Sequence, residues 1–182
     1  MNVPNMLTLW RICMVPVIIW MILDKRMEAA FWVSLAAALS DAADGVIAKQ
    51  FNMQTTLGAY LDPIADKALL VSIFVVLGYE GFLPTWLVIL VVFRDALIIG
   101  GALLFYTLTQ SLEMTPLIIS KINTVIQLLL GLIVLGTEAF GIQIAMISDP
   151  LIYLTGATTL VSGAYYVTGW TRRVSAIEGN KC

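Results

Sequence analysis

The sequence predicts an all-α integral membrane protein in which six transmembrane helices surround a cytoplasm-facing cavity inside the bilayer. Its 182 residues are 60% hydrophobic and 12% charged, whereas a typical soluble domain is about 45–50% apolar and about 25% charged. Six apolar runs approach the roughly 20 residues that a helix needs to cross a bilayer. Two of these runs carry aspartates, and a carboxylate at the bilayer centre costs about 3 kcal/mol. These aspartates are therefore expected to face a polar cavity.

The apolar runs follow one another with short connections, so residues 1–182 are expected to form one domain. We find no internal repeat and no low-complexity segment. In chain order, the expected spans are about Met6–Leu23, Ala29–Lys49, Leu61–Gly78, Leu83–Tyr106, Pro116–Leu135 and Leu151–Trp170.

Polar and turn-forming residues set the expected ends of these spans. The first span ends at the charged cluster Asp24–Arg26, and Gly81 with Pro84 signals a turn before the fourth span. Asp149 and Pro150 precede the sixth span. Loops are expected at Gln50–Tyr60, Ser111–Thr115 and Thr137–Asp149, of which the last is the longest and lies partly in the membrane interface.

The distribution of basic residues predicts the orientation, because lysine and arginine accumulate on the cytoplasmic side of membrane proteins. Six spans place both termini on one side, and the opposite side has mainly Lys25 and Arg26. We therefore expect a bacterial cytoplasmic (inner) membrane protein with its termini and active site in the cytoplasm. The basic residues on the terminal side are Lys49, Lys67, Lys121, Arg172, Arg173 and Lys181.

Charge and composition also exclude several kinds of function. The formal net charge of −2 gives no support to nucleic-acid binding, which requires a basic surface. The chain has no histidine, and histidine is the usual general base and the commonest metal ligand. Catalysis must therefore use carboxylates, lysine, tyrosine or a metal ion.

Four aspartates within or beside the second and third spans are the main candidates for chemistry. Asp41 and Asp44 are three residues apart, and Asp62 and Asp66 are four apart, so each pair shares a helix face. Pro63 fits the first turn of a helix, which places Asp62 at or near the start of the third span. Antiparallel spans would bring the two pairs together near the cytoplasmic surface.

Four bare carboxylates this close would repel one another and partly protonate. A divalent cation removes this repulsion, and oxygen ligands without histidine or cysteine favour Mg²⁺, Mn²⁺ or Ca²⁺. Two such ions about 4 Å apart suit phosphoryl chemistry. Gly45, Ala48, Gly58 and Ala59 leave room for a flat or bulky ligand, although small residues are also ordinary at membrane helix interfaces. Lys49 offers a cation for a phosphate.

The spacing of these residues resembles the signature of the CDP-alcohol phosphatidyltransferase family. The matching pattern is Asp41-x-x-Asp44-Gly45-x-x-Ala48-Lys49, eight residues, then Gly58-x-x-x-Asp62-x-x-x-Asp66. The departure is Lys49, where the family normally has arginine; lysine keeps the charge and loses the bidentate fork. Asn2–Arg11 resembles the start of the glycerol-type members, and Phe93-Arg94-Asp95 and Ser120–Gln127 look more like the eukaryotic-type cardiolipin synthases.

The resemblance implies a six-helix fold, often homodimeric, and a reaction in which an alcohol displaces CMP from a CDP-linked lipid. For a cardiolipin synthase, the hydroxyl of phosphatidylglycerol attacks CDP-diacylglycerol. Two divalent ions, Mg²⁺ or Mn²⁺, are expected to assist this reaction. By the same resemblance, Asp41, Asp44 and Asp62 hold the metals, and Asp66 is the general base and touches the second metal. The residues implied to bind the CDP-lipid are Asn5, Thr8, Arg11, Gly45, Ala48, Lys49 and Gly58.

Other polar residues inside the apolar runs are candidates for the acceptor site. Arg94 and Lys121 are expected to bind the acceptor's phosphate, because buried membrane charges usually line substrate paths. The alternative is an internal Arg94–Asp95 or Lys121–Glu113 structural pair. Asn123 and Gln127 share a helix face and are equally compatible with holding two helices together.

Two other functions stay open at this point. A phosphatidylglycerophosphate synthase would use the same aspartates with glycerol 3-phosphate as the acceptor. A cation transporter would use them as an ion site, but it would have no need for the Gly58 spacing.

Overall fold

The structure, a computed structural model, describes residues 3–51, 56–109, 118–142 and 145–179. Side chains are described at position 10 and in the ranges 12–40, 67–101, 118–142 and 149–169. Within these residues every regular element is an α-helix, which confirms the all-α part of the prediction. The helices are α1 (Val3–Leu23), α2 (Met27–Phe51), α3 (Thr56–Tyr79), α4 (Thr85–Thr109), α5 (Ile118–Phe140) and α6 (Ala145–Gly179).

The predicted start of the third span was wrong. We expected a loop over Gln50–Tyr60 and a helix start beside Pro63, whereas α2 continues to Phe51 and α3 begins at Thr56. Pro63 is thus the eighth residue of α3 rather than part of its first turn. A proline inside a helix removes one backbone hydrogen bond, but membrane helices tolerate it where neighbouring groups satisfy the freed carbonyl.

The predicted connector Thr137–Asp149 was also wrong. Helix α5 continues to Phe140, and α6 begins at Ala145 with Pro150 inside it. Gly141 lies between them with φ of 62°, a left-handed conformation that glycine adopts without strain. The turn predicted at Gly81 is confirmed, since Gly81 has φ of 82° between α3 and α4. The expected loop Ser111–Thr115 lies outside the described residues.

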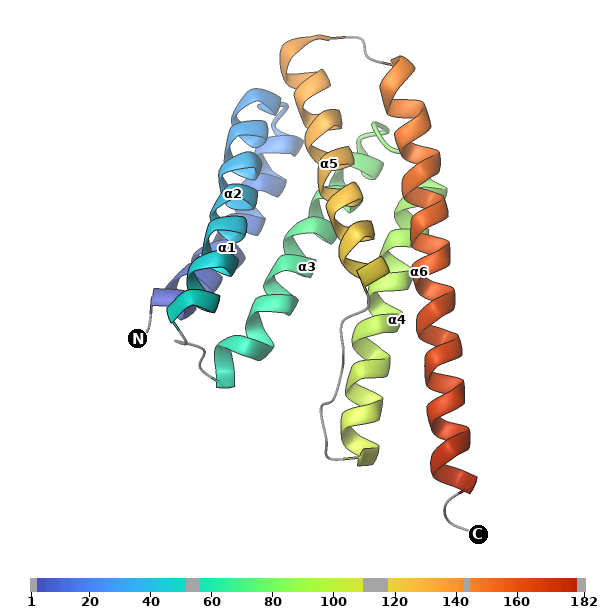
Figure 1. The fold of residues 1–182 in the computed structure, drawn as a ribbon. Helices are drawn as coiled ribbons and strands as arrows, with labels where there is room; N and C mark the ends of the chain where they lie inside the picture. Colours follow the sequence, from blue (N-terminus) through green and yellow to red (C-terminus); the bar gives the residue numbers. More distant parts are fainter. Residues whose placement is uncertain (1–2, 52–55, 110–117, 143–144, 180–182) are drawn as a thin grey trace.

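The helices form a bundle whose order in space differs from the order in the chain (Figure 1). Helix α1 packs on α2 and α3, α2 packs on α5, α5 on α6, α6 on α4, and α4 on α3. These contacts close a ring in the order α1, α2, α5, α6, α4 and α3, and α3 also touches α5 across its middle. In Figure 1, α1 begins, α2 ends, α3 begins and α6 ends at the lower end of the bundle.

Apolar side chains from most of the helices fill the centre of this ring. Ile22, Leu77, Leu87, Leu130 and Leu135 are fully buried. At the upper end in Figure 1, Lys25 in the turn after α1 pairs with Glu80 in the turn after α3.

Helix α5 has the longest apolar stretch among the described residues. Among the described residues, α5 is the one helix that is long and apolar enough to cross a membrane, with a mean hydropathy of 2.1. The apolar stretches Ile12–Leu23, Met27–Ser40 and Lys67–Tyr79 are shorter.

Candidate active site

The four predicted aspartates lie on adjoining ends of two consecutive helices. Asp41 and Asp44 belong to the second half of α2, and Asp62 and Asp66 belong to the first half of α3. Both halves lie toward the lower end of the bundle in Figure 1. The side chains of these aspartates are outside the described set, so their convergence on a metal stays a prediction. Among the side chains that are described, no group of three or more cysteines, aspartates or glutamates could hold a metal ion.

The predicted CDP-lipid residues are distributed over three helices. Asn5, Thr8 and Arg11 belong to α1, and Gly58 belongs to α3. Their side chains, like those of Gly45, Ala48 and Lys49 in α2, lie outside the described set. Helix α1 packs on both α2 and α3. The helix that carries three of the seven positions therefore contacts both helices that carry the other four.

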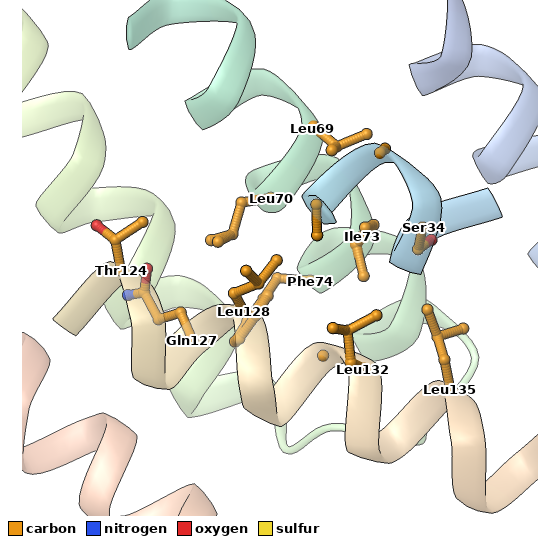
Figure 2. Close-up of a pocket in the computed structure, with 13 residues that line it drawn as sticks. Ser34, Leu69, Leu70, Ile73, Phe74, Thr124, Gln127, Leu128, Leu132 and Leu135 are labelled. Atoms are coloured by element: carbon orange, nitrogen blue, oxygen red, sulfur yellow. The ribbon is translucent and has the colours of Figure 1, made fainter. Parts of the chain in front are cut away.

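A cavity of about 70 Å³ lies between α2, α3 and α5. Figure 2 shows side chains from these helices around it, with Leu70 and Phe74 from α3 and Leu128 from α5. Its polar lining residues are Ser34, Thr124 and Gln127. The wall is otherwise apolar, which suits hydrocarbon better than a charged group.

The cavity lies close to the aspartate pattern along both helices. Ala37 lines it and precedes position 41 by four residues of continuous helix, and Leu70 lines it and follows position 66 by four residues. Four residues correspond to about one helical turn. The cavity is therefore separated from the nearest aspartate positions by about one turn of α2 and of α3.

A buried network of charged and hydroxyl groups joins four helices. The Asp95 Oδ1 of α4 accepts hydrogen bonds from Arg94 Nη1 and from Lys67 Nζ of α3, both at 2.6 Å. Arg94 Nη2 donates to the hydroxyls of Ser120 in α5 and Ser162 in α6, both at 2.7 Å. Arg94 and Asp95 are each 2% exposed, and the Lys67 side chain is 19% exposed.

This network contains the internal Arg94–Asp95 pair that we considered as the alternative to acceptor binding. Arg94 makes three hydrogen bonds here, while its Nε and the Asp95 Oδ2 are buried without a partner. Lys121 is exposed on α5, and Glu113 lies outside the described residues. The expected contact of Arg94 and Lys121 with an acceptor phosphate therefore stays a prediction.

Sequence reasoning missed Lys67, Ser120 and Ser162 as members of this network. We counted Lys67 only as a charge on the cytoplasmic side. It lies 28 residues from Asp95, and Ser162 lies 68 residues from Arg94. No helical periodicity relates residues on different helices, so only the packing of the bundle could reveal these contacts.

The polar face of α5 predicted at Asn123 and Gln127 joins α5 to α6. Asn123 Oδ1 accepts hydrogen bonds from the hydroxyls of Thr158, at 2.8 Å, and Thr159, at 3.0 Å. Gln127 Nε2 donates to the Thr159 hydroxyl at 3.3 Å. This arrangement favours the interhelical role that the sequence left open, since such hydrogen bonds hold membrane helices together.

Comparison with known proteins identifies the family. Residues 1–161 match the profile of the CDP-alcohol phosphatidyltransferases. The chain belongs to this family. The aspartate pattern that begins at Asp41 lies inside the matched region, as do Arg94 and Asp95.

The curated relatives carry two different activities in their names. The chain is 33% identical, over 91% of its length, to a chloroplastic CDP-diacylglycerol–glycerol-3-phosphate 3-phosphatidyltransferase of Oryza sativa. It is 32% identical over 97% of its length to a CMP-forming cardiolipin synthase of Homo sapiens, and 30% identical over 98% to that of Rattus norvegicus. The chain spans 56% of the length of the rice relative and 64% of the length of the human and rat relatives.

Proposed function

We propose that this protein is a CMP-forming cardiolipin synthase of the membrane, which transfers the phosphatidyl group of CDP-diacylglycerol to a hydroxyl of phosphatidylglycerol. The new bond joins the acceptor oxygen to the lipid-side phosphorus, the bond from that phosphorus to CMP breaks, and the acceptor's proton goes to a base. The proposal includes six membrane spans, termini and active site in the cytoplasm, and a homodimer.

The observation that best supports phosphatidyl transfer is the position of the four aspartates in this member of the family. Positions 41 and 44 in α2 and positions 62 and 66 in α3 lie on consecutive helices at one end of the bundle, beside an apolar cavity. This arrangement supports a site where a charged diphosphate meets carboxylate-bound cations while a hydrocarbon chain lies in an apolar space. The cavity between α2, α3 and α5 offers an apolar space for a few methylene groups of such a chain.

The residues available fit the divalent ions that the family implies. Asp41, Asp44, Asp62 and Asp66 supply only oxygen donors, the ligands that Mg²⁺ and Mn²⁺ prefer. Bound there, these ions would neutralise the diphosphate and stabilise charge as the phosphorus is attacked. Asp66 would accept the proton of the acceptor hydroxyl, and Asp41, Asp44 and Asp62 would be the principal ligands. Arg11 and Lys49 would meet the diphosphate.

The acceptor is assigned to phosphatidylglycerol on two grounds. The relatives named as cardiolipin synthases align with nearly the whole chain, and the Arg94-Asp95 dipeptide is more typical of that group. Lys121, which is exposed, would then contact the phosphate of phosphatidylglycerol. Arg94 would reach that phosphate only by exchanging its hydrogen bonds to Ser120 and Ser162, because its side chain is buried. The second candidate, a phosphatidylglycerophosphate synthase, is supported by the rice relative, which is 33% identical.

Release of CMP from CDP-diacylglycerol distinguishes the two acceptors. The purified protein is incubated in mixed micelles with CDP-diacylglycerol and Mg²⁺, and phosphatidylglycerol or glycerol 3-phosphate is added separately. We expect CMP release that depends on phosphatidylglycerol, with cardiolipin as the lipid product. Release that depends on glycerol 3-phosphate would assign the chain to the second candidate, and metal flux across vesicles without CMP release would support a cation transporter.

A further inference from the structure

Helices α3 and α4 are joined at two levels by contacts of different kinds. Near the upper end in Figure 1, Gly78 of α3 lies against the Val88 side chain of α4. Eleven residues earlier in α3, Lys67 Nζ donates to Asp95 Oδ1 of α4. Eleven helical residues correspond to about 16 Å. Figure 1 shows α3 and α4 diverging toward the lower end of the bundle.

The Lys67–Asp95 pair is anchored by the rest of the buried network. Asp95 Oδ1 also binds Arg94, whose Nη2 is hydrogen-bonded to Ser120 and Ser162 on α5 and α6. The Arg94 stem lies against Gly163, where a Cβ would be 3.8 Å from Cγ. The carboxylate that receives Lys67 is thus held by three helices. The N-terminal half of α3, which precedes Lys67 in the chain, carries Asp62 and Asp66.

We propose that Lys67 and Asp95 are positioning residues, which fix the aspartate-bearing half of α3 against α4 for phosphatidyl transfer. The inference rests on the proposed function for its catalytic part. Lys67 directly follows Asp66, so movement of Lys67 displaces the backbone of the base. A displacement of about 1 Å can reduce turnover by about 100-fold.

Replacement of Lys67 tests this role without leaving a lone buried charge. Lys67→Met removes the tie from α3 and leaves the Arg94–Asp95 pair intact. We expect kcat for CMP release to fall by about 10- to 100-fold, with KM for both lipids little changed. Lys67→Arg retains a cation that can reach Asp95 and should restore most of the turnover. Ser162→Ala is the matched control, because it removes a hydrogen bond from the same network at the α6 end.

Electron paramagnetic resonance measures the helix geometry independently of the reaction. In a Cys13→Ser, Cys182→Ser background, spin labels are attached to cysteines at Ala68 of α3 and Ala96 of α4, which are both exposed. We expect Lys67→Met to broaden the distribution of distances between the labels, and Lys67→Arg and Ser162→Ala to leave it narrow.

The combined results decide the proposal. A broadened distribution with reduced kcat in Lys67→Met, and neither change in Ser162→Ala, supports it. An unchanged distribution overturns it, because a fall in kcat would then mean that Lys67 contacts the substrate directly. A broadened distribution with unchanged kcat overturns the catalytic part. If the unmodified protein releases no CMP with either acceptor, the proposed function fails, while the distance distribution still decides whether the pair ties α3 to α4.

Discussion

Asp66 and Lys67 are neighbours in the chain, yet different kinds of reasoning assign their roles. Asp66 belongs to a pattern of fixed spacings within two consecutive helices, and such a pattern can be read from the sequence alone. Lys67 takes its role from Asp95, which is 28 residues away on another helix. The motif was therefore predictable, and so was the Arg94–Asp95 pair as an alternative, whereas the contact of Lys67 with that pair required the packed structure.

The substitution Asp66→Asn tests the proposed base. Asparagine has nearly the same shape as aspartate but cannot accept a proton, and a general base contributes about 10²- to 10⁴-fold to a rate. We expect CMP release to fall by at least about 100-fold, while binding of CDP-diacylglycerol remains measurable by titration calorimetry. Asp149→Asn, at an exposed position in α6, is the control and should keep full activity. Unchanged turnover in Asp66→Asn would remove Asp66 as the base.

The substitution Lys49→Arg tests the one departure from the family's pattern. Arginine keeps the positive charge and adds a bidentate fork that matches a diphosphate. We expect the variant to fold, to retain turnover, and to have an equal or lower KM for CDP-diacylglycerol. A folded but inactive variant would show that the site specifically requires lysine.

At the scale of the helices, the number of elements and several of their ends were predictable, whereas other ends were not. The lengths of the apolar runs determined the six helices, because each run is long enough for a helix and short connections separate them. The ends were misplaced where Pro63 and Pro150 were taken as start signals. Both prolines lie inside helices, and the packing around a membrane helix decides whether a proline is tolerated.

Close packing of α3 on α4 predicts opposite effects for two glycine substitutions. A Cβ at Gly78 would lie 2.6 Å from Val88 Cγ2, and valine has little freedom to rotate away. We expect Gly78→Ala to lower the free energy of unfolding by about 1–3 kcal/mol. Gly100 is also in a helix, and a Cβ there meets no atom within 4 Å.

Gly100→Ala is therefore the matched control for Gly78→Ala. It should raise stability slightly, because alanine is favoured over glycine in a helix by about 1 kcal/mol. Thermal unfolding of both variants in the same detergent measures the difference. Equal midpoints would contradict the close approach of α3 and α4 at Gly78.

At the scale of the whole molecule, the two ends of the bundle differ in what they carry. The lower end in Figure 1 has the aspartate-bearing halves of α2 and α3 and the end of α6. The upper end has the turn at Lys25, the turn at Gly81 and the C-terminal end of α5. Helix α6 has 35 residues, about 52 Å of helix, so it exceeds the roughly 30 Å hydrocarbon core of a bilayer.

Labelling of cysteines in intact cells tests the proposed orientation. Ile142 is exposed and lies two residues beyond Phe140, the last residue of α5. Helix α5 ends at the upper end of the bundle in Figure 1. In a Cys13→Ser, Cys182→Ser background, we expect a membrane-impermeant maleimide to modify Ile142→Cys from outside the cell. The matched variant with Cys182 as the single cysteine should react only after the membrane is opened. The reverse pattern would place the proposed active site on the outer side.

The ring order of the helices has a consequence for how the protein is made. A ribosome delivers α2 well before α5, yet α2 packs on α5 as well as on α1. The nascent chain must therefore leave one flank of α2 facing lipid or an insertion factor until most of the polypeptide has been synthesised. Biogenesis therefore cannot proceed by completing one helical hairpin after another. A chain truncated before residue 118 would lack α5, the helix that packs on α2.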